Sequence, residues 1–221
     1  MNIDNFTRSE LARRMNTSLI EPYVTDGQLR DFTGKCLNYP LAAIAVDTNL
    51  VSSLYVLLKG SQTKCCAVIS YPHGGKTLDT KLNDIKYVIE NGAEELDICM
   101  DYGAFRSGDY DKVRSDLEKL IKACRKYNPV IVVQFPVLSN EQKIKACELV
   151  LDAGGDFIKT SCGYGYETKV EDVILIRKEL HEKIKIEVAG GVRTLEDAKA
   201  MLRAGADRIA SSSVLNILIC C

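Results

Sequence analysis

Residues 153–161 read AGGDFIKTS, a turn of small residues that leads directly into a short apolar strand. The glycines end the helical pattern of Asn140–Asp152, because glycine adopts the left-handed conformation with which a chain leaves a helix. Similar turns stand at residues 91–93 (NGA) and 204–207 (AGAD), each between a helical pattern and a strand. These stretches predict a repeated unit in which strands of a parallel sheet alternate with helices.

The same unit recurs along the whole chain, about every 25 to 35 residues. Eight strands are predicted, at Thr17–Ile20, Leu41–Val46, Cys65–Ser70, Glu95–Cys99, Val130–Phe135, Phe157–Thr160, Ile184–Val188 and Arg208–Ala210. Helices are predicted between them, at Gly27–Leu37, Thr48–Leu58, Thr80–Glu90, Tyr110–Tyr127, Asn140–Asp152, Val170–Leu180 and Leu195–Arg203.

Eight strands, each followed by one helix, favour a particular α/β fold, the (β/α)8 TIM barrel. The alternative is an open, flavodoxin-like sheet with extra elements. We expect residues 1–221 to form a single barrel domain with a short N-terminal helical extension.

The composition narrows the classes of partner. The chain has 221 residues, with 29 basic and 30 acidic side chains and a formal net charge of −1. It therefore offers neither a basic stripe for nucleic acid nor a polybasic anchor for a membrane. Residues 1–15 mix charged side chains with few apolar ones, unlike a secretory signal or an apolar span, which predicts a cytoplasmic location. A small-molecule substrate is the expected partner.

The nine cysteines are expected to be reduced thiols. Their number is odd, and no pair shows the CxxC spacing that is typical of zinc or redox sites. The two histidines, His73 and His181, lie far apart in the sequence and predict no ligand cluster. We expect the cysteines to act as small apolar residues and the protein to bind no metal.

Polar side chains near the ends of the predicted strands are the candidates for chemistry. In a barrel the carboxyl ends of the strands meet at one mouth, so these side chains converge there. They are Asp47, Asp97, Gln134, Lys159 and Glu187. Lys159 stands out, because a buried ammonium in an apolar strand is costly. It is either one half of an internal ion pair or a nucleophilic amine that attacks a substrate carbonyl.

Several motifs carry a resemblance to a known family. They are GAEELD (92–97), AGGDFIKTSCG (153–163), AGGVRT (189–194), AGADRIASSS (204–213) and YPHG (71–74). From about Asn16 to its end, the sequence resembles the deoxyribose-phosphate aldolase family, class I aldolases on a (β/α)8 barrel. The resemblance implies that Lys159 forms a Schiff base and that Asp97 is its partner in moving protons. It also implies reversible aldol cleavage of a small, phosphorylated sugar or aldehyde, without metal or organic cofactor, since the lysine imine is the electron sink.

The resemblance also implies a phosphate site. In the family, backbone N–H groups after the last three strands hold the substrate phosphate. The matching positions are Gly163, Gly190, Gly191, Ser212 and Ser213. The alternative for the glycine pair is a tight turn between strand and helix. The sequence is compatible with a homo-oligomer.

Other positions depart from the family pattern. Glu187 stands where the family has a second lysine, and Asn16 stands where it has an aspartate. The remaining departures are Ala45, the pair Asp47-Thr48, Val130 and Gln134. We expect Asn16, Asp47 and Gln134 to line an altered pocket around a retained nucleophile.

The change at Glu187 reverses a charge beside the nucleophile. Two unit charges about 5 Å apart, at an effective dielectric constant near 20, interact by roughly 3 kcal/mol, about two pKa units. An ionised Glu187 would therefore raise the pKa of Lys159. Lys185, expected on the same face of the strand, could partly neutralise it.

Two explanations for Glu187 remain open. Either the enzyme has lost an electrostatic activator, or Glu187 is the working acid and base for a different carbonyl substrate with little cleavage of deoxyribose phosphate. A barrel that binds a phosphorylated ligand without turnover is the further alternative. The presence of both Lys159 and Asp97 counts against it.

Overall fold

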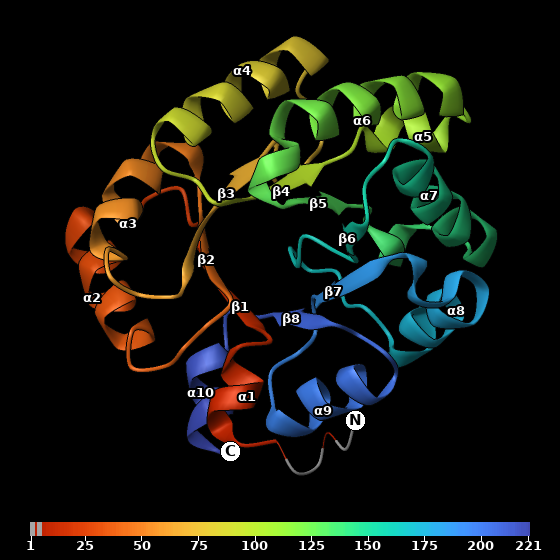
Figure 1. Cartoon of the computed structure of the whole chain (residues 1–221). Coiled ribbons are helices and arrows are strands. Elements are labelled where there is room, and N and C mark those ends of the chain that lie inside the picture. Colours follow the sequence, from red (N-terminus) through yellow and green to blue (C-terminus); the bar gives the residue numbers. More distant parts are fainter. Residues whose placement is uncertain (1–2, 4–5) are drawn as a thin grey trace.

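The computed structural model describes Ile3 and residues 6–221. Eight parallel strands form a closed barrel in chain order, and the helices surround it (Figure 1). The strands are β1 (Met15–Leu19), β2 (Ala43–Val46), β3 (Lys64–Ile69), β4 (Glu95–Cys99), β5 (Pro129–Val132), β6 (Phe157–Lys159), β7 (Lys185–Ala189) and β8 (Arg208–Ala210). β1 pairs with β8 as well as with β2, so the sheet closes on itself and the open-sheet alternative is excluded.

The helices between the strands follow the predicted order. They are α1 (Arg8–Ala12), α2 (Asp26–Cys36), α3 (Val51–Leu57), α4 (Leu78–Glu90), α5 (Tyr102–Arg106), α6 (Tyr110–Cys124), α7 (Asn140–Asp152), α8 (Val170–Leu180), α9 (Leu195–Arg203) and α10 (Val214–Ile219). Short 3-10 turns are η2 (Thr48–Leu50), η3 (Arg125–Tyr127), η4 (Phe135–Val137) and η5 (His181–Lys183). None of the described helices is long and apolar enough to cross a membrane.

The predicted fold class is confirmed, and the differences are local. All eight strands occur where expected, and α7, α8 and α9 have the predicted bounds. α5 and α10 were not predicted, because helices of five and six residues are too short to show a clear hydrophobic period. β4 is therefore followed by two helices instead of one.

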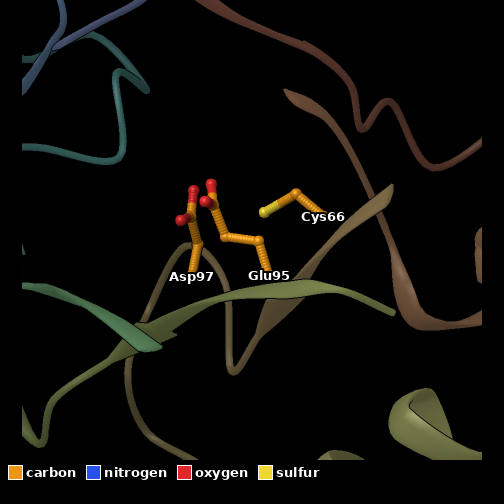
Figure 2. A group of neighbouring side chains, drawn as sticks. All are labelled: Cys66, Glu95 and Asp97. Atoms are coloured by element: carbon orange, nitrogen blue, oxygen red, sulfur yellow. The ribbon is translucent and has the colours of Figure 1, made fainter. Parts of the chain in front are cut away.

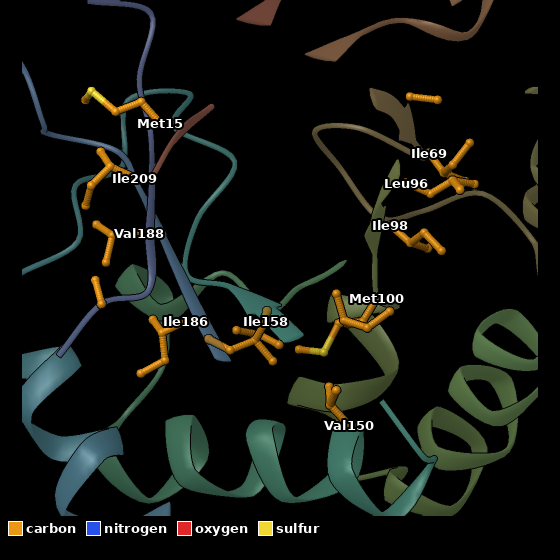
Figure 3. Close-up of a cluster of buried hydrophobic side chains, with 14 of the residues drawn as sticks. Met15, Ile69, Leu96, Ile98, Met100, Val150, Ile158, Ile186, Val188 and Ile209 are labelled. Atoms are coloured by element: carbon orange, nitrogen blue, oxygen red, sulfur yellow. The ribbon is translucent and has the colours of Figure 1, made fainter. Parts of the chain in front are cut away.

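Side-chain alternation along the strands separates two environments. On β4, Leu96 and Ile98 belong to the large apolar layer between barrel and helices, which Figure 3 shows together with Ile158, Ile186 and other labelled residues. Their neighbours Glu95 and Asp97 point the other way, because successive side chains of a strand face opposite sides. β4, β6, β7 and β8 carry charged residues into the barrel interior, whereas β2 and β3 place small apolar residues in a cluster of their own.

Capped helices fix the loops that follow the strands. Thr194 begins α9 with a capping box, in which its hydroxyl accepts a hydrogen bond from the Asp197 N–H and Asp197 accepts one from the Thr194 N–H. Ser139 begins α7 in the same way with Gln142. These caps set where each loop ends.

Candidate active site

A cavity of 340 Å³ opens at the carboxyl ends of the strands. Seven of the expected site residues line it: Asn16, Lys159, Gly163, Gly190, Gly191, Ser212 and Ser213. They come from β1, from the end of β6 and from the loops after β6, β7 and β8. The barrel thus brings together residues almost 200 positions apart in the sequence, as far as from Asn16 to Ser213.

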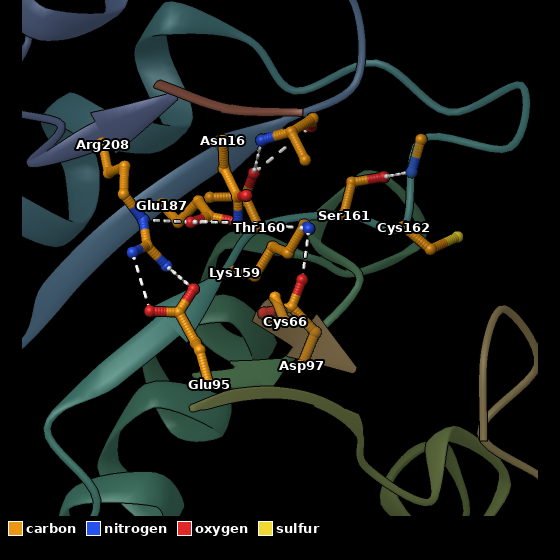
Figure 4. A network of polar contacts seen from close by, with 12 residues as sticks. Asn16, Cys66, Glu95, Asp97, Lys159, Thr160, Ser161, Cys162, Glu187 and Arg208 are labelled. Atoms are coloured by element: carbon orange, nitrogen blue, oxygen red, sulfur yellow. Dashed lines mark hydrogen bonds and ion pairs between the residues drawn. The ribbon is translucent and has the colours of Figure 1, made fainter. Parts of the chain in front are cut away.

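Lys159 is the last residue of β6, and its side chain is almost completely buried beside the cavity. Its Nζ donates a hydrogen bond to Asp97 Oδ2 at 2.5 Å and lies 3.1 Å from Glu187 Oε1 (Figure 4). β6 and β7 pair with Lys159 opposite Glu187, which places both side chains at one level of the barrel interior. The amine is therefore held between two carboxylates.

Arg208 holds Glu187 from the other side. It lies opposite Glu187 on the neighbouring strand β8, and its Nε donates to Glu187 Oε2. Its two terminal nitrogens donate to both oxygens of Glu95, at 2.9 and 2.6 Å (Figure 4). One guanidinium thus links β4, β7 and β8. We call Glu95, Asp97, Lys159, Glu187 and Arg208 the interior charge cluster.

The pKa values of Asp97 and Glu187, two members of the interior charge cluster, are shifted in opposite directions. Burial raises the pKa of Asp97 to about 6, with further increases from Glu187 and Glu95, although the Lys159 ammonium opposes them. Burial also acts to raise the pKa of Glu187, but Arg208 and Lys159 outweigh it and hold that pKa below its usual value. Glu187 is therefore ionised at neutral pH, and Asp97 exchanges its proton near neutral pH.

The same contacts act on Lys159. Burial lowers its pKa, but the Asp97 carboxylate, Tyr71 and Glu187 outweigh burial and raise the pKa well above the usual value. An ammonium has no free electron pair and cannot attack a carbonyl carbon. Lys159 must therefore lose a proton before it can react. The direction agrees with the expectation for an ionised Glu187.

Lys185 does not neutralise Glu187. It stands at the amino end of β7, where its side chain is exposed and its Nζ lies 3.7 Å from Asp156. Strand alternation places Lys185 and Glu187 on the same side of β7. Lys185 nevertheless lies outside the barrel interior, because it is at the amino end of the strand. Arg208 supplies the counter-charge instead.

Tyrosine side chains form one wall of the cavity. The ring of Tyr71 lies 5.9 Å from Lys159 Nζ, and its hydroxyl donates to the Cys162 carbonyl at 2.7 Å. Tyr164 packs edge-on against Tyr71, with 6.1 Å between ring centres. Both line the cavity, which therefore has an aromatic side next to the amine.

The loops after β7 and β8 present backbone N–H groups to the cavity. Gly190 and Gly191 have φ of 85° and 90°, a left-handed conformation that favours glycine. Within the described residues, the N–H groups of Gly190, Gly191 and Ser212 donate no hydrogen bond. The N–H groups of Gly163 and Ser213 donate to Ser161 Oγ and Ser211 Oγ. Free N–H groups in a concave loop suit an anion such as phosphate.

Two expected pocket residues lie outside this cavity. Asp47 is exposed, and its carboxylate caps η2 by accepting a hydrogen bond from the Thr48 N–H at 2.7 Å. Gln134 is buried and left-handed, and its Oε1 accepts from the Cys162 N–H at 2.9 Å. Through this hydrogen bond, Gln134 stabilises the loop after β6 without lining the cavity. Both residues follow strands, which predicts a place in the pocket, but a strand end alone does not fix where the side chain points.

Cys66, Glu95 and Asp97 have ligand atoms within 4.8 Å of one another, and Figure 2 shows the three side chains close together in the interior. Both carboxylates already contact cations, Glu95 at Arg208 and Asp97 at Lys159. A metal ion would have to compete with these two cations. The donor set therefore fits an internal ion-pair network better than a metal centre.

Glu95 and Arg208 were not among the site residues expected from the sequence. Each carried a usable signal: Arg208 opens an apolar strand, as unusual there as Lys159 is in β6. Glu95 lies two residues before Asp97, so the two share one face of β4.

Comparisons with known proteins find aldolases among the relatives of this chain. Residues 24–217 match the model of a DeoC/LacD family aldolase. A deoxyribose-phosphate aldolase of Thermoanaerobacter sp. (strain X514) is 35% identical over 212 residues, 94% of this chain and 95% of that protein. The deoxyribose-phosphate aldolase of Caldicellulosiruptor saccharolyticus is 35% identical over 96% of this chain and 98% of its own length.

Solved structures of aldolases have the same fold as this chain. "QR15, an Aldolase" superposes with a TM-score of 0.91 at 31% identity, covering 95% of both chains. A deoxyribose phosphate aldolase from Aeropyrum pernix, described as a unique tetramer, has the same fold, with a TM-score of 0.89 at 24% identity over 98% of this chain and 93% of that one.

Proposed function

This chain belongs to the DeoC/LacD family of aldolases, and from that membership we propose that Lys159 is the amine through which it acts. The enzyme is a carbon–carbon lyase that performs reversible aldol cleavage. The observation that carries the proposal is the Lys159 amine at the cavity, hydrogen-bonded to Asp97 at 2.5 Å. The proposed substrate is a small phosphorylated sugar or aldehyde, such as 2-deoxyribose 5-phosphate.

The proposed reaction begins with attack of the neutral Lys159 amine on the substrate carbonyl carbon. Water leaves, and a protonated imine forms. The bond between the α and β carbons then breaks, its electron pair moves toward the imine nitrogen, and the β carbon departs as an aldehyde when its hydroxyl loses a proton, while an enamine stays on Lys159. A proton returns to the enamine carbon, and water hydrolyses the new imine to release the second carbonyl product. No metal or organic cofactor takes part in this scheme.

Asp97 is the proposed proton carrier. Its Oδ1 has no hydrogen-bond partner among the described residues, so this oxygen is free to take and return a proton. A pKa of about 6 lets both protonation states exist close to neutral pH, which suits a group that must do both. Asp97 would take the hydroxyl proton when the bond breaks.

Glu187 is proposed to act as a fixed negative charge. Its two oxygens face Lys159 and Arg208, and both cations hold it ionised. A carboxylate with a lowered pKa is a poor general acid at neutral pH. We therefore assign Glu187 to the control of the Lys159 proton and Arg208 to the positioning of Glu187.

Reduction in the presence of substrate tests the nucleophile. Borohydride should fix the imine as a stable adduct on the peptide that contains Lys159, and mass spectrometry locates it. Lys159→Met should fold, lose turnover and give no adduct at that position. Full turnover by Lys159→Met would contradict the proposal, and binding of phosphorylated ligands without any adduct in the unmodified protein would favour a non-catalytic barrel.

The Lys159–Glu187 contact favours a second candidate, the same chemistry on a carbonyl substrate other than deoxyribose 5-phosphate. Glu187→Lys separates the candidates, because it removes one of the charges that raise the pKa of Lys159 and restores the lysine of the family pattern. If deoxyribose phosphate is the substrate, its cleavage at neutral pH should rise about tenfold or more, as expected for a pKa change of one unit or above. If activity on an aldehyde found by screening rises or persists while deoxyribose phosphate is still not cleaved, the second candidate holds.

We assign the substrate phosphate to the loops that carry Gly190, Gly191 and Ser212, because the N–H groups of these residues donate no hydrogen bond within the described part of the chain. A chelator should leave activity unchanged.

A cytoplasmic location is supported by seven buried free cysteines, which suit a reducing compartment. Homo-oligomers are proposed by analogy with the tetramer from Aeropyrum pernix, and light scattering measures them.

A further inference from the structure

A second cavity, of 320 Å³, lies outside the barrel between α4 and α6. Its apolar lining is Leu78, Met100, Val113, Leu117 and Leu120, and its polar lining includes Lys76, Lys81, Asp101, Lys112 and Asp116. The proposed aldolase mechanism uses none of these residues. One of them, Lys81, is in an unusual environment for a lysine.

Lys81 is a buried amine with a neutral partner. Its side chain projects from α4 and is only 3% exposed. The Nζ donates one hydrogen bond, to the Cys99 carbonyl at 2.8 Å. Among the described residues, no carboxylate forms an ion pair with Lys81. The other buried lysines differ, since Lys143 is 2.7 Å from Asp172 and Lys159 contacts two carboxylates.

The environment of Lys81 favours the uncharged amine. Removing an ammonium from water without a counter-ion is costly, so the group gives up its proton more easily. Burial lowers the pKa of Lys81, and Lys112 adds to this, although Cys99, Asp101 and Asp116 oppose it. Both aspartates are engaged by Lys112, at 2.7 and 3.0 Å.

The other charged group at this cavity is also paired. Lys76, in the segment that precedes α4, lies 2.7 Å from Asp84. Every lysine of the cavity except Lys81 therefore has a carboxylate partner within the described chain. Lys81 is the amine of this cavity that carries a free electron pair most easily.

We propose that Lys81 is a second imine-forming site, which takes small aliphatic aldehydes in the cavity between α4 and α6. The amine nitrogen attacks the aldehyde carbon to give a carbinolamine, the hydroxyl leaves as water with one proton, and a carbon–nitrogen double bond forms. When protonated, the imine nitrogen keeps one N–H to donate to the Cys99 carbonyl. The apolar lining contacts the alkyl part of the aldehyde. Aldol cleavage itself releases aldehydes, so the reactant is present wherever the enzyme works.

Reductive trapping in the Lys159→Met protein tests this site without interference from the proposed catalytic amine. The full chain is incubated with propanal and cyanoborohydride near pH 7.5, digested with trypsin and mapped by mass spectrometry. Modification of Lys81 blocks cleavage there and yields the propylated peptide of residues 77–86. We expect Lys81 to be labelled at least about tenfold faster than Lys143, because the partner of Lys143 is the Asp172 carboxylate and that of Lys81 is a neutral carbonyl.

Two variants and a pH series serve as controls. Lys81→Arg should fold and lose the adduct on residues 77–86, while labelling elsewhere is unchanged. Leu78→Phe narrows the cavity at its rim and should slow the labelling of Lys81 but not that of exposed lysines such as Lys178. The labelling rate of Lys81 should reach half its maximum at a lower pH than that of a free lysine derivative in the same solution.

The proposal is overturned if Lys81 is labelled no faster than Lys143, or if its pH profile coincides with that of the free lysine derivative. These results do not depend on Lys159, whose adduct with substrate is measured on a different peptide of the unmodified protein. Failure at Lys81 therefore leaves the aldolase proposal intact, and failure at Lys159 leaves this one intact.

Discussion

At the scale of residues, the interior charge cluster has more acidic than basic members. Glu95, Asp97 and Glu187 face two cations, Lys159 and Arg208. A buried group with one excess negative charge binds a proton readily. Asp97 receives it, because Arg208 contacts the other two carboxylates and not Asp97.

This proton makes stability depend on pH. Asp97 has a pKa of about 6 in the folded chain against 3.8 for the free side chain, so its contribution to stability is full below about pH 3.8 and is lost as the pH rises through 6. Asp97→Asn cannot titrate. Relative to the unmodified protein, its free energy of unfolding should rise from pH 4 to pH 7 by up to roughly 3 kcal/mol.

Urea unfolding at a series of pH values measures this difference. Asp84→Asn is the matched control, since Asp84 pairs with Lys76 at the surface and should change stability by less than about 1 kcal/mol at any pH. A pH-independent difference for Asp97→Asn would show that Asp97 carries no extra proton in the folded chain.

Removing the charge of Glu187 should make Lys159 react at lower pH. Glu187→Gln takes away one of the groups that raise the pKa of Lys159, so a larger fraction is the free amine at neutral pH. The rate of imine trapping, followed against pH, should show its midpoint shifted downward. Glu21→Gln is the control, because Glu21 also lines the cavity but forms no ion pair with Lys159. An equal shift in both variants would mean that general charge, and not contact, is responsible.

At the scale of elements, the turn after β7 depends on the absence of a side chain at Gly190. A Cβ at this position would lie 2.2 Å from the Tyr166 carbonyl oxygen, in the loop after β6. Gly190→Ala should push the two loops apart and raise the KM for a phosphorylated substrate about tenfold or more, equivalent to roughly 1.4 kcal/mol, with a smaller change in kcat.

Gly165→Ala separates the clash from backbone strain. Gly165 has a φ of 76°, but a Cβ there would meet nothing within 4 Å. This variant should cost roughly 1 kcal/mol of stability and leave KM nearly unchanged. Similar KM values for the two variants would argue against a phosphate role for the Gly190 turn.

The elements could be predicted from the sequence more fully than the contacts between them. Alternation and small-residue turns are local, so β4, β8 and α7 appear where expected. The orientation of Asp47 and Gln134 depends on the backbone conformation after each strand, which residue type alone does not specify. The Arg208–Glu95 pair joins positions 113 residues apart, and no local pattern gives such a partner. Lys159 was identified because one charge in an apolar strand is itself a local signal.

At the scale of the whole molecule, Arg208 connects strands on different parts of the barrel. It is 8% exposed and bonds to Glu95 on β4 and Glu187 on β7. Arg208→Met would leave two buried carboxylates without this cation, and should lower the free energy of unfolding by about 3–5 kcal/mol.

Equilibrium unfolding in urea checks this value, and other variants locate its cause. Arg208→Lys should lose less stability, and adding Glu95→Gln to Arg208→Met should restore part of the loss. Arg193→Met removes an exposed pair with Glu167 and should cost less than about 1 kcal/mol. A loss of the same small size for Arg208→Met would show that the buried carboxylates do not need this cation.

The position of Arg208 also has a consequence for synthesis. Ribosomes make the chain from its N-terminus, so Glu95 and Glu187 exist in the nascent polypeptide before Arg208 and β8 are translated. Until then, Glu95 lacks its cationic partner and Glu187 has only Lys159, so burying the two carboxylates is unfavourable. We therefore expect the barrel to be completed only at the end of translation, and a product terminated before residue 208 to be digested by a protease faster than the full chain.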